Sequence, residues 1–460
     1  MSMDQITRRD FLRFGACTAV GTSSLAHTLF NLRQVNAAAA NSDPTDYKAL
    51  VCVFLFGGND SANMLIPADA SQHAIYAAAR QNLTLPLDAL QLLNSPDAAG
   101  RLYGLHPAMA GMAGLVNRGD AAMVANLGTL LAPVTLDDFR NGSSALPPQL
   151  FSHNDQQVLW QTSVRHSPAH YHSSGWGGRI ADLLHSVHND STISMNLSMS
   201  GNNFFQTGKS VLPVPVSGDR RSDFRLRTSW RTDDKTKFET VKGMFDRTHD
   251  NLLERTFSDV NNTAIETSEL FNVAMEGATD FENFPNSGLG QQLRSAARVI
   301  EQREALGMRR QIFFCATGGF DTHGDQLGAH AGLLGGLSGA LTAFQDTMES
   351  LGVSNNVTTF TASDFGRTFI SNGRGSDHGW GGHHIVLGGA VDGAQVYGQF
   401  PDIDLQSSPH DTGRGRWLPT TSVDQYAATL AKWFGVSDSD IDTVLPNLGN
   451  FSQRNLGFLG

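Results

Sequence analysis

Three short apolar segments, far apart along the chain, each lead into glycine or polar residues with acids among them. They are 49–56 (ALVCVFLF), 311–316 (QIFFCA) and 357–362 (VTTFTA), and their β-branched and aromatic residues predict buried strands. In an open α/β sheet, the residues that follow the carboxyl ends of the strands gather in one place. The sequence therefore predicts a doubly wound, mostly parallel α/β sheet flanked by helices, with one site assembled from distant segments.

Hard metal ligands follow each of the three predicted strands. Asp60 follows the first, Asp321 and His323 follow the second, and Asp364 follows the third. Residues i and i+2 of an extended segment point to the same side, so Asp321 and His323 can bind one cation. A pair of oxygen and nitrogen ligands suits zinc or manganese, whereas an all-oxygen site favours calcium or magnesium. The alternative is that Asp321 caps the next helix and His323 is an ordinary loop residue.

A glycine-rich segment at 375–384 (GSDHGWGGHH) offers further ligands. We expect Asp377, His378 and His384 to contribute to the metal site, because glycines let several side chains turn inward. His383 and His384 alternate in direction along the chain, so only one of these two is expected to face the site. Together with the strand-end acids, this segment predicts a metal-dependent hydrolase.

Two residues are candidates for catalysis. Ser152 lies at the predicted start of a helix over 156–162, where backbone N–H groups and the helix dipole favour an anion and would suit a nucleophile. The alternative is that Ser152 is only the N-cap, with Asp155 completing a capping box. Arg367 could hold an anionic ester oxygen, or it could form an ion pair with Asp364 that stabilises the loop.

The first forty residues predict an export signal rather than part of the fold. Residues 7–13 (TRRDFLR) form a twin-arginine motif, an uncharged stretch covers 14–32, and the small residues 37–40 suit a cleavage site. The alternative, an amino-terminal helix or membrane anchor, is disfavoured by the glycines and polar residues of this stretch. We therefore expect the twin-arginine translocase as a partner during export, a periplasmic or extracellular location, and no transmembrane segment in the mature chain.

The rest of the chain, 41–460, is predicted to form one α/β domain. Between 201 and 286 the composition shifts to Asn, Asp, Thr, Arg and Phe, which we interpret as an inserted cap or side lobe, with ordinary peripheral helices as the alternative. Apolar residues at steps of three and four over 334–348 predict a crossover helix packed on the sheet. Cys52 and Cys315 lie in two of the apolar runs and are expected to be buried thiols, with a disulfide between neighbouring strands as the alternative.

The acidic balance of the chain bears on its partners. The formal net charge of −11 argues against nucleic acid. An acidic protein also needs local positive charge to attract an anionic substrate, and bound cations supply that charge most directly. Composition therefore agrees with a small anionic ester as the ligand, provided that a metal ion is bound.

Motifs over nearly all of the mature part resemble a family of twin-arginine-exported bacterial proteins of unknown function within the alkaline phosphatase and sulfatase superfamily. They include FLFGGNDSANMLIP, FSHNDQQVLWQT, GWGGRIADLL, GGFDTHGDQ, SDFGRT, SDHGWGGHH and PTTSVDQYAATLAKWFG. The resemblance implies an alkaline-phosphatase-like, doubly wound sheet. It also implies two metal ions as a rule, with a nucleophilic serine, threonine or modified cysteine between them.

The resemblance further implies roles for individual residues by their order along the chain. It assigns the acid after the first strand to Asp60, the nucleophile region to Ser152, the middle pair to Asp321 and His323, the late acid to Asp364 and the last histidine to His378. The middle pair is spaced Asp-x-His instead of Asp-x-x-x-His, and Phe365 stands where the superfamily usually has a histidine. A second ion would then need Asp377 or His378. We therefore expect one or two divalent ions, which could be zinc, manganese, magnesium or calcium.

Two functions agree with these observations. The first is a metal-dependent hydrolase of phosphate or sulfate esters that uses metal-activated nucleophilic displacement. The second is a noncatalytic, metal-stabilised protein of the same fold that binds an envelope polymer or a partner protein. An exported oxidoreductase is disfavoured, because the chain has no glycine fingerprint of a dinucleotide site and too few cysteines for iron–sulfur clusters.

Overall fold

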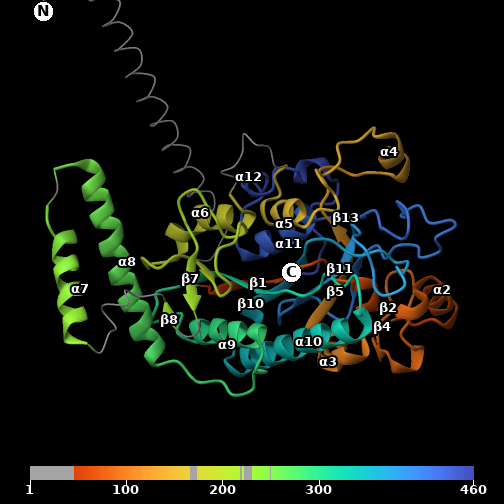
Figure 1. Ribbon diagram of the computed structural model, residues 1–460, viewed down its shortest axis with the longest axis horizontal. Coiled ribbons are helices and arrows are strands. Elements are labelled where there is room, and N and C mark those ends of the chain that lie inside the picture. Colours follow the sequence, from red (N-terminus) through yellow and green to blue (C-terminus); the bar gives the residue numbers. More distant parts are fainter. Residues whose placement is uncertain (1–45, 166–173, 218–219, 222–230, 249) are drawn as a thin grey trace, which may run out of the picture.

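A mixed sheet of ten strands crosses the molecule, with helices on both of its faces (Figure 1). The computed structural model describes residues 46–165, 174–217, 220–221, 231–248 and 250–460. The predicted export signal, 1–40, lies outside these residues. The predicted α/β domain is therefore described from its first strand to its carboxyl end, with three short internal segments and one single residue left out.

The three predicted strands lie side by side at the centre of the sheet. β1 (Lys48–Leu55) pairs in parallel with β9 (Arg310–Thr317) on one side and with β10 (Val357–Ser363) on the other. Every residue of β1 after Lys48 is buried, as expected for a strand that is covered on both faces. The predicted mostly parallel α/β sheet is confirmed, and the carboxyl ends of these three strands meet at one edge.

Further strands extend the sheet on both sides. Beyond β9 come β6 (Asn196–Ser198), β7 (Val214–Ser217) and β8 (Arg220–Arg221); beyond β10 come β11 (Gly382–Leu387), β5 (Ala121–Gly128) and β12 (Val396–Gly398), and β13 (Thr421–Ser422) also pairs with β5. β11 is antiparallel to β10 and to β5. The amino end of β11 therefore lies at the same edge as the carboxyl ends of β1, β9 and β10. A separate small sheet contains β2 (Leu65–Pro67), β4 (Tyr103–Leu105) and β3 (Gln91–Leu92).

Helices cover the sheet from both sides. In Figure 1, α3 (Ala110–Arg118), α9 (Gly288–Glu301) and α10 (Gln326–Ser350) lie below the sheet, and α5 (His153–Thr162), α6 (Trp176–His188) and α11 (Val423–Phe434) lie above it. The other α-helices that the structure describes outside the segment 201–286 are α2 (Ala70–Arg80), α4 (Leu136–Asn141) and α12 (Ile441–Val444). This cover on both faces is the doubly wound arrangement.

α10 is the predicted crossover helix between β9 and β10. It buries Leu334, Leu337 and Leu341, which lie at the spacing that the sequence predicted. By length and composition it is the one helix in the described residues that could cross a membrane. Its contacts with α3 and α9 show that it packs within the lower helical layer of the domain.

Part of the segment predicted as a cap forms a helical hairpin at one end of the molecule. α7 (Thr232–Phe245) and α8 (Leu252–Glu276) run side by side and project beyond the sheet (Figure 1). The same segment also supplies β7 and β8 to the sheet. The projecting part is therefore shorter than the interval 201–286 that the change of composition marks.

The two cysteines of the described chain are buried free thiols. In the register of β1 and β9, Cys52 lies opposite Phe314, and Cys315 lies opposite Val53. Successive residues of a strand point to opposite faces, so the two thiols lie on opposite faces of the sheet. The alternative of a disulfide between these strands is therefore excluded by their register.

Candidate functional site

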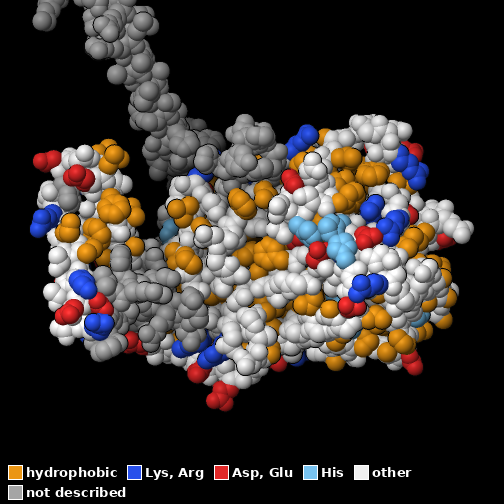
Figure 2. Space-filling view, viewed as in Figure 1, with side chains coloured by type: hydrophobic (Ala, Val, Ile, Leu, Met, Phe, Trp, Pro, Cys, Tyr) orange, Lys and Arg blue, Asp and Glu red, His pale blue; other side chains and the backbone are white. Residues whose placement is uncertain are grey.

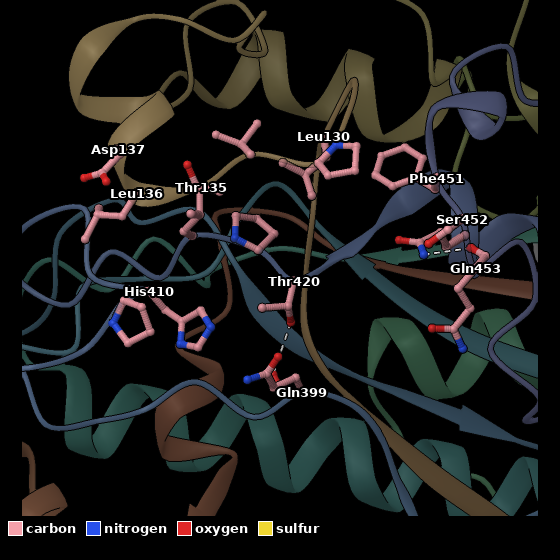
Figure 3. Close-up of a pocket in the computed structure, with 16 residues that line it drawn as sticks. Leu130, Thr135, Leu136, Asp137, Gln399, His410, Thr420, Phe451, Ser452 and Gln453 are labelled. Carbon is pink, nitrogen blue, oxygen red and sulfur yellow. Dashed lines mark hydrogen bonds between the residues drawn. The ribbon is translucent and has the colours of Figure 1, made fainter.

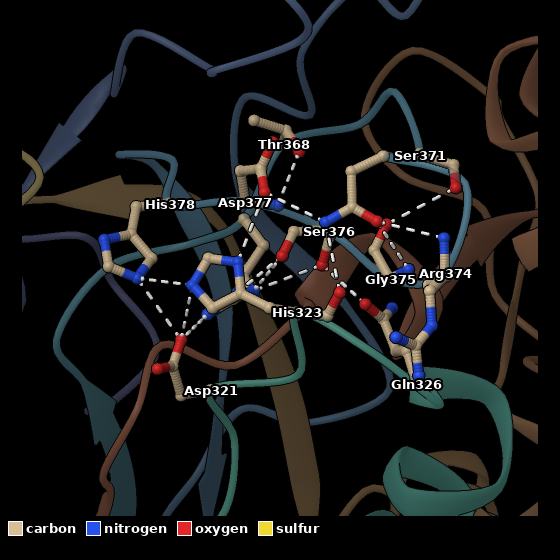
Figure 4. A network of polar contacts seen from close by, with 12 residues as sticks. Asp321, His323, Gln326, Thr368, Ser371, Arg374, Gly375, Ser376, Asp377 and His378 are labelled. Atoms are coloured by element: carbon tan, nitrogen blue, oxygen red, sulfur yellow. Dashed lines mark hydrogen bonds and ion pairs between the residues drawn. The ribbon is translucent and has the colours of Figure 1, made fainter.

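One aspartate and three histidines converge at the carboxyl ends of the central strands β1, β9 and β10. Asp321 and His323 follow β9, His378 precedes β11, and His153 begins α5. Asp321 Oδ1 lies 3.1 Å from His323 Nε2 and 3.2 Å from His378 Nε2 (Figure 4). His153 Nε2 lies 3.6 Å from Asp321 Oδ2. We refer to these four residues as the His–Asp cluster.

The other ring nitrogen of each histidine is held by an oxygen atom. The contacts are His153 Nδ1 to Asp364 Oδ2 at 2.6 Å, His323 Nδ1 to Asp377 Oδ1 at 3.2 Å, and His378 Nδ1 to the Phe151 carbonyl oxygen at 2.8 Å. These oxygens accept hydrogen bonds, so each Nδ1 carries a proton and each Nε2 of a neutral ring has a lone pair. Metal-binding histidines are oriented in the same way, by a carboxylate or carbonyl oxygen on the other nitrogen.

The Nε2 lone pairs therefore point toward one another and toward a carboxylate. His323 Nε2 and His378 Nε2 are 2.9 Å apart. Burial, together with the charges of His153 and Arg367, lowers the pKa of His378, which keeps this ring neutral near pH 7. Such an arrangement needs a positive charge between the atoms, either a shared proton or a metal ion. The ligand atoms of His153, Asp321 and His378 lie within 4.8 Å of one another, which one cation can bridge.

The donor set and its exposure suit a metal with an open coordination position. Imidazole nitrogens suit zinc better than they suit calcium or magnesium. The Asp321 side chain is 46% exposed, so a substrate can approach the cluster. Figure 2 shows the histidines at the surface with basic side chains beside them. Arg414, whose Nη1 lies 2.7 Å from Asp377 Oδ2, is half exposed and adds positive charge to this rim.

Arg367 holds Asp321 from behind. Its guanidinium is fully buried, and Nη1 donates to Asp321 Oδ1 at 2.8 Å and to the Gly57 carbonyl oxygen at 2.9 Å, while Nε donates to Ser376. Burial alone would raise the pKa of Asp321, but the hydrogen bond and charge of Arg367 and the nearby histidines outweigh it and lower that pKa. Arg367 therefore keeps Asp321 ionised and is not free to bind an ester oxygen. Its ion-pair partner is Asp321, whereas the sequence suggested Asp364.

Asp364 lies behind His153. It is buried, and its Oδ2 accepts hydrogen bonds from Gln157 at 2.9 Å and from the Gly57 amide at 3.2 Å, besides the contact with His153. Burial raises the pKa of Asp364, although these hydrogen bonds act against it. The centre of the Phe365 ring lies 4.9 Å from that of the His153 ring and 4.8 Å from that of the His378 ring. The two residues thus position imidazoles of the cluster.

Asp377 orients His323 in the same way as Asp364 orients His153. Its Oδ1 accepts from Asn372 at 2.9 Å in addition to His323, and its Oδ2 is paired with Arg414. Burial opposes ionisation, but the hydrogen bonds from Asn372, Arg414 and His323 lower the pKa of Asp377 to about 2. A carboxylate that stays ionised at Nδ1 fixes the direction of His323 Nε2 (Figure 4).

Asp60 does not join the cluster. Its carboxylate is fully buried and forms an ion pair with Arg80 and a hydrogen bond with Gln326. The Gln326 Oε1 atom accepts from Ser376 Oγ at 2.6 Å, and Ser376 in turn accepts from Arg367. A buried chain of polar groups therefore connects Asp60 to Arg367, but Asp60 itself does not reach the cluster.

Ser152 and His384 also lie apart from the four clustered residues. Ser152 is the N-cap residue of α5, but its hydroxyl donates to Asp155 Oδ2 at 2.6 Å and caps no backbone N–H group. His384 is buried within β11, with its ring 5.8 Å from that of Trp160, and burial lowers its pKa to about 4. The glycine-rich segment thus contributes His378 alone to the cluster, besides Asp377 behind it.

The sequence did not single out His153 as a ligand. At the helix start 152–155, the sequence points to the hydroxyl of Ser152 as the candidate group. In the structure, the imidazole of the next residue, His153, contacts Asp321 instead. The only sequence signal is its position at the amino end of a predicted helix, where side chains can face the carboxyl ends of strands.

The family of the chain follows from a match over most of its length. A family model described as "Protein of unknown function (DUF1501)" matches residues 47–445. The chain belongs to this family. No curated protein matches the DUF1501 chain in sequence.

Solved structures similar to the DUF1501 chain are distant. Lipoteichoic acid synthase LtaP from Listeria monocytogenes is 8% identical, with 88% of this chain and 78% of that chain covered and a TM-score of 0.33. PsFucS1 sulfatase from Pseudoalteromonas sp. is 10% identical, with 94% and 75% covered and a TM-score of 0.35. Ps i-CgsB, solved in complex with k-i-k-neocarrahexaose, is 7% identical, with 86% and 74% covered and a TM-score of 0.37. Likenesses of this size carry no argument about activity.

Proposed function

We propose that the DUF1501 chain is an exported, metal-dependent hydrolase of phosphate or sulfate esters whose His–Asp cluster holds one divalent cation. The observation that carries the proposal is the convergence of three histidine Nε2 atoms on the Asp321 carboxylate, with each Nδ1 held by an oxygen. One ion is favoured over two because the acids outside the cluster have other partners: Asp60 is paired with Arg80, Asp364 with His153, and Asp377 with His323 and Arg414.

A divalent cation in the cluster would polarise a phosphoryl or sulfuryl oxygen of the ester. The residues of the chain would orient the ligands of this cation and balance its charge. Arg367 keeps Asp321 ionised and fixed, while Asp364, Asp377 and the Phe151 carbonyl aim the imidazoles. The half-exposed Arg414 at the rim favours the approach of an anion.

Water is the attacking group in this proposal. Ser152, the residue that the resemblance places in the nucleophile region, donates a hydrogen bond from its hydroxyl to the Asp155 carboxylate. A hydroxyl committed in this way has no base of the cluster beside it, so the proposal assigns it no covalent step.

Metal analysis and an ester screen on the natively exported chain test this proposal. We expect about one metal ion per chain, and turnover of an aryl phosphate or an aryl sulfate that a chelator abolishes and zinc restores. Absence of bound metal would contradict the proposal. Bound metal without turnover of any ester in a panel of phosphate monoesters, diesters and sulfates would favour a noncatalytic, metal-stabilised protein that binds an envelope polymer.

Export by the twin-arginine route is part of the proposal and has its own test. Replacing Arg8 and Arg9 together by lysine is expected to leave most of the chain in the cytoplasm, because the translocase reads the paired guanidinium groups. Cell fractionation and the size of the processed chain measure this. Arg33→Lys, in the same leader, is the matched control and should be exported normally; export of the double variant at the wild-type level would overturn the assignment.

A further inference from the structure

A groove runs beside the edge strand β12, and none of the residues that line it belongs to the His–Asp cluster. Two cavities of about 670 and 700 Å³ share the lining residues Gln399, Thr420 and Gln453, so they form one groove. Figure 3 shows its first half, with Thr135, Leu136 and Asp137 on one wall, Thr420 and Gln399 opposite, and Ser452 and Gln453 at one end. The second half is lined by the backbone segment 393–399 and by the loop 95–98.

β12 presents unpaired backbone groups along this groove. It is the last strand of the sheet and pairs only with β5 in the described residues, with Val396 opposite Met123. The Met123 amide donates to the Gln395 carbonyl oxygen at 3.0 Å. In a parallel ladder, this bond turns the C=O group of Gln395 and both backbone groups of Tyr397 toward β5, and it turns the N–H and C=O groups of Val396 and the N–H group of Gly398 outward. The two outward N–H groups are two residues apart, as on the free edge of a sheet.

The charge of the groove restricts what can occupy it. Among the residues that line the two cavities, none is lysine or arginine, and the carboxylates are Asp97 and Asp137. Asp97 is paired with Arg101, whereas Asp137 is exposed. Burial lowers the pKa of His410, so this ring adds no positive charge near pH 7. The groove therefore disfavours anions and accepts neutral or basic groups.

We propose that this groove binds an extended peptide segment of a partner protein, uncharged or basic, which pairs as an added strand with the outer side of β12. The amide and hydroxyl side chains of the lining could also bind a neutral glycan. Alternating backbone donors and acceptors about 7 Å apart match a peptide strand better than a sugar chain. The proposal is independent of the ester chemistry.

Phage-displayed random decapeptides, selected on the full chain, test the proposal. Selected peptides should be rich in lysine or arginine and in β-branched residues, and they should bind with saturation in fluorescence anisotropy. Val396→Pro removes one outward N–H group without removing a bond to β5, and it is expected to weaken binding at least about tenfold. Val396→Thr keeps that N–H group and should bind as the wild type does. Asp137→Lys should weaken the binding of the basic peptides.

Hydrogen exchange on the wild-type chain gives a readout that needs no variant. Bound peptide should slow exchange of the Val396 and Gly398 amides. Failure to select any saturable peptide, equal affinity of a folded Val396→Pro variant, or unchanged exchange of both amides would each overturn the proposal. If a neutral oligosaccharide such as maltohexaose displaces the selected peptides, the groove is a glycan site and the peptide proposal is overturned.

Discussion

Asp321→Asn is expected to abolish hydrolysis and to lower metal affinity more than about 100-fold, because losing a residue that binds the metal costs more than losing a residue that only orients a ligand, which costs about 10–100-fold. Asp321 is the only carboxylate that faces the three Nε2 atoms among the described residues, and it alone offsets the charge of a cation there. Asparagine keeps the size of the side chain and can still accept from Arg367. We expect kcat/KM to fall at least about 1000-fold, which corresponds to about 4 kcal/mol.

A matched variant separates this effect from a general loss of charge. Asp325 lies four residues further along, is 90% exposed and pairs with the exposed Arg374 at 3.3 Å. Asp325→Asn should therefore leave metal content and kcat/KM at the wild-type level. The account would be contradicted if Asp321→Asn kept one metal ion per chain and full turnover. It would also be contradicted if both variants lost activity equally.

Asp60→Asn is expected to reduce the free energy of unfolding by about 3–5 kcal/mol, because it leaves the Arg80 guanidinium buried without a counter-charge. Both side chains of this pair have no exposed surface. The remaining partners of Arg80 are neutral, namely the Thr368 and Phe369 carbonyl oxygens at 3.1 Å and Asn63. Urea denaturation measures the loss. The double variant Asp60→Asn with Arg80→Leu should be more stable than Asp60→Asn alone.

The pH dependence of this pair has a definite sign. Burial would raise the pKa of Asp60, but the charges of Arg80 and His330 and two hydrogen bonds lower it below its ordinary value. The stabilisation is therefore complete above the ordinary pKa of an aspartate and is lost as the pH falls through the lowered pKa of the folded protein. A loss of less than about 1 kcal/mol in Asp60→Asn at neutral pH would contradict the buried pair. If Asp60→Asn lost bound metal without losing stability, Asp60 would be a metal ligand.

The strands and three members of the cluster, Asp321, His323 and His378, could be predicted from the sequence for physical reasons. A strand buried on both faces is rich in apolar and β-branched residues, so β1, β9 and β10 are visible in the sequence as short runs of such residues. Asp321 and His323 follow the end of one such run at a spacing of two, and they meet in the structure. These predictions needed only local sequence and the rule that sites form at the ends of strands.

The other contacts depend on tertiary partners that no local pattern shows. Asp60 follows a strand as Asp321 does, but Arg80 from α2 reaches it and holds it in the interior. His153, which the sequence did not predict as a ligand, enters from the start of α5 on the upper layer, whereas the predicted ligand His378 lies at this end of the sheet because β11 runs antiparallel. Whether a strand-end acid binds a cation, orients a histidine or pairs with arginine is decided by these neighbours.

X-ray absorption at the zinc edge of the zinc-loaded chain measures the ligands of the bound ion. If the His–Asp cluster holds zinc with an open position, we expect histidine nitrogens at about 2.0–2.1 Å, a carboxylate oxygen at about 2.0–2.2 Å and one further oxygen from water, and the oxygen contribution should change in Asp321→Asn. Ligands that are all oxygens, or a spectrum identical in Asp321→Asn, would exclude this site.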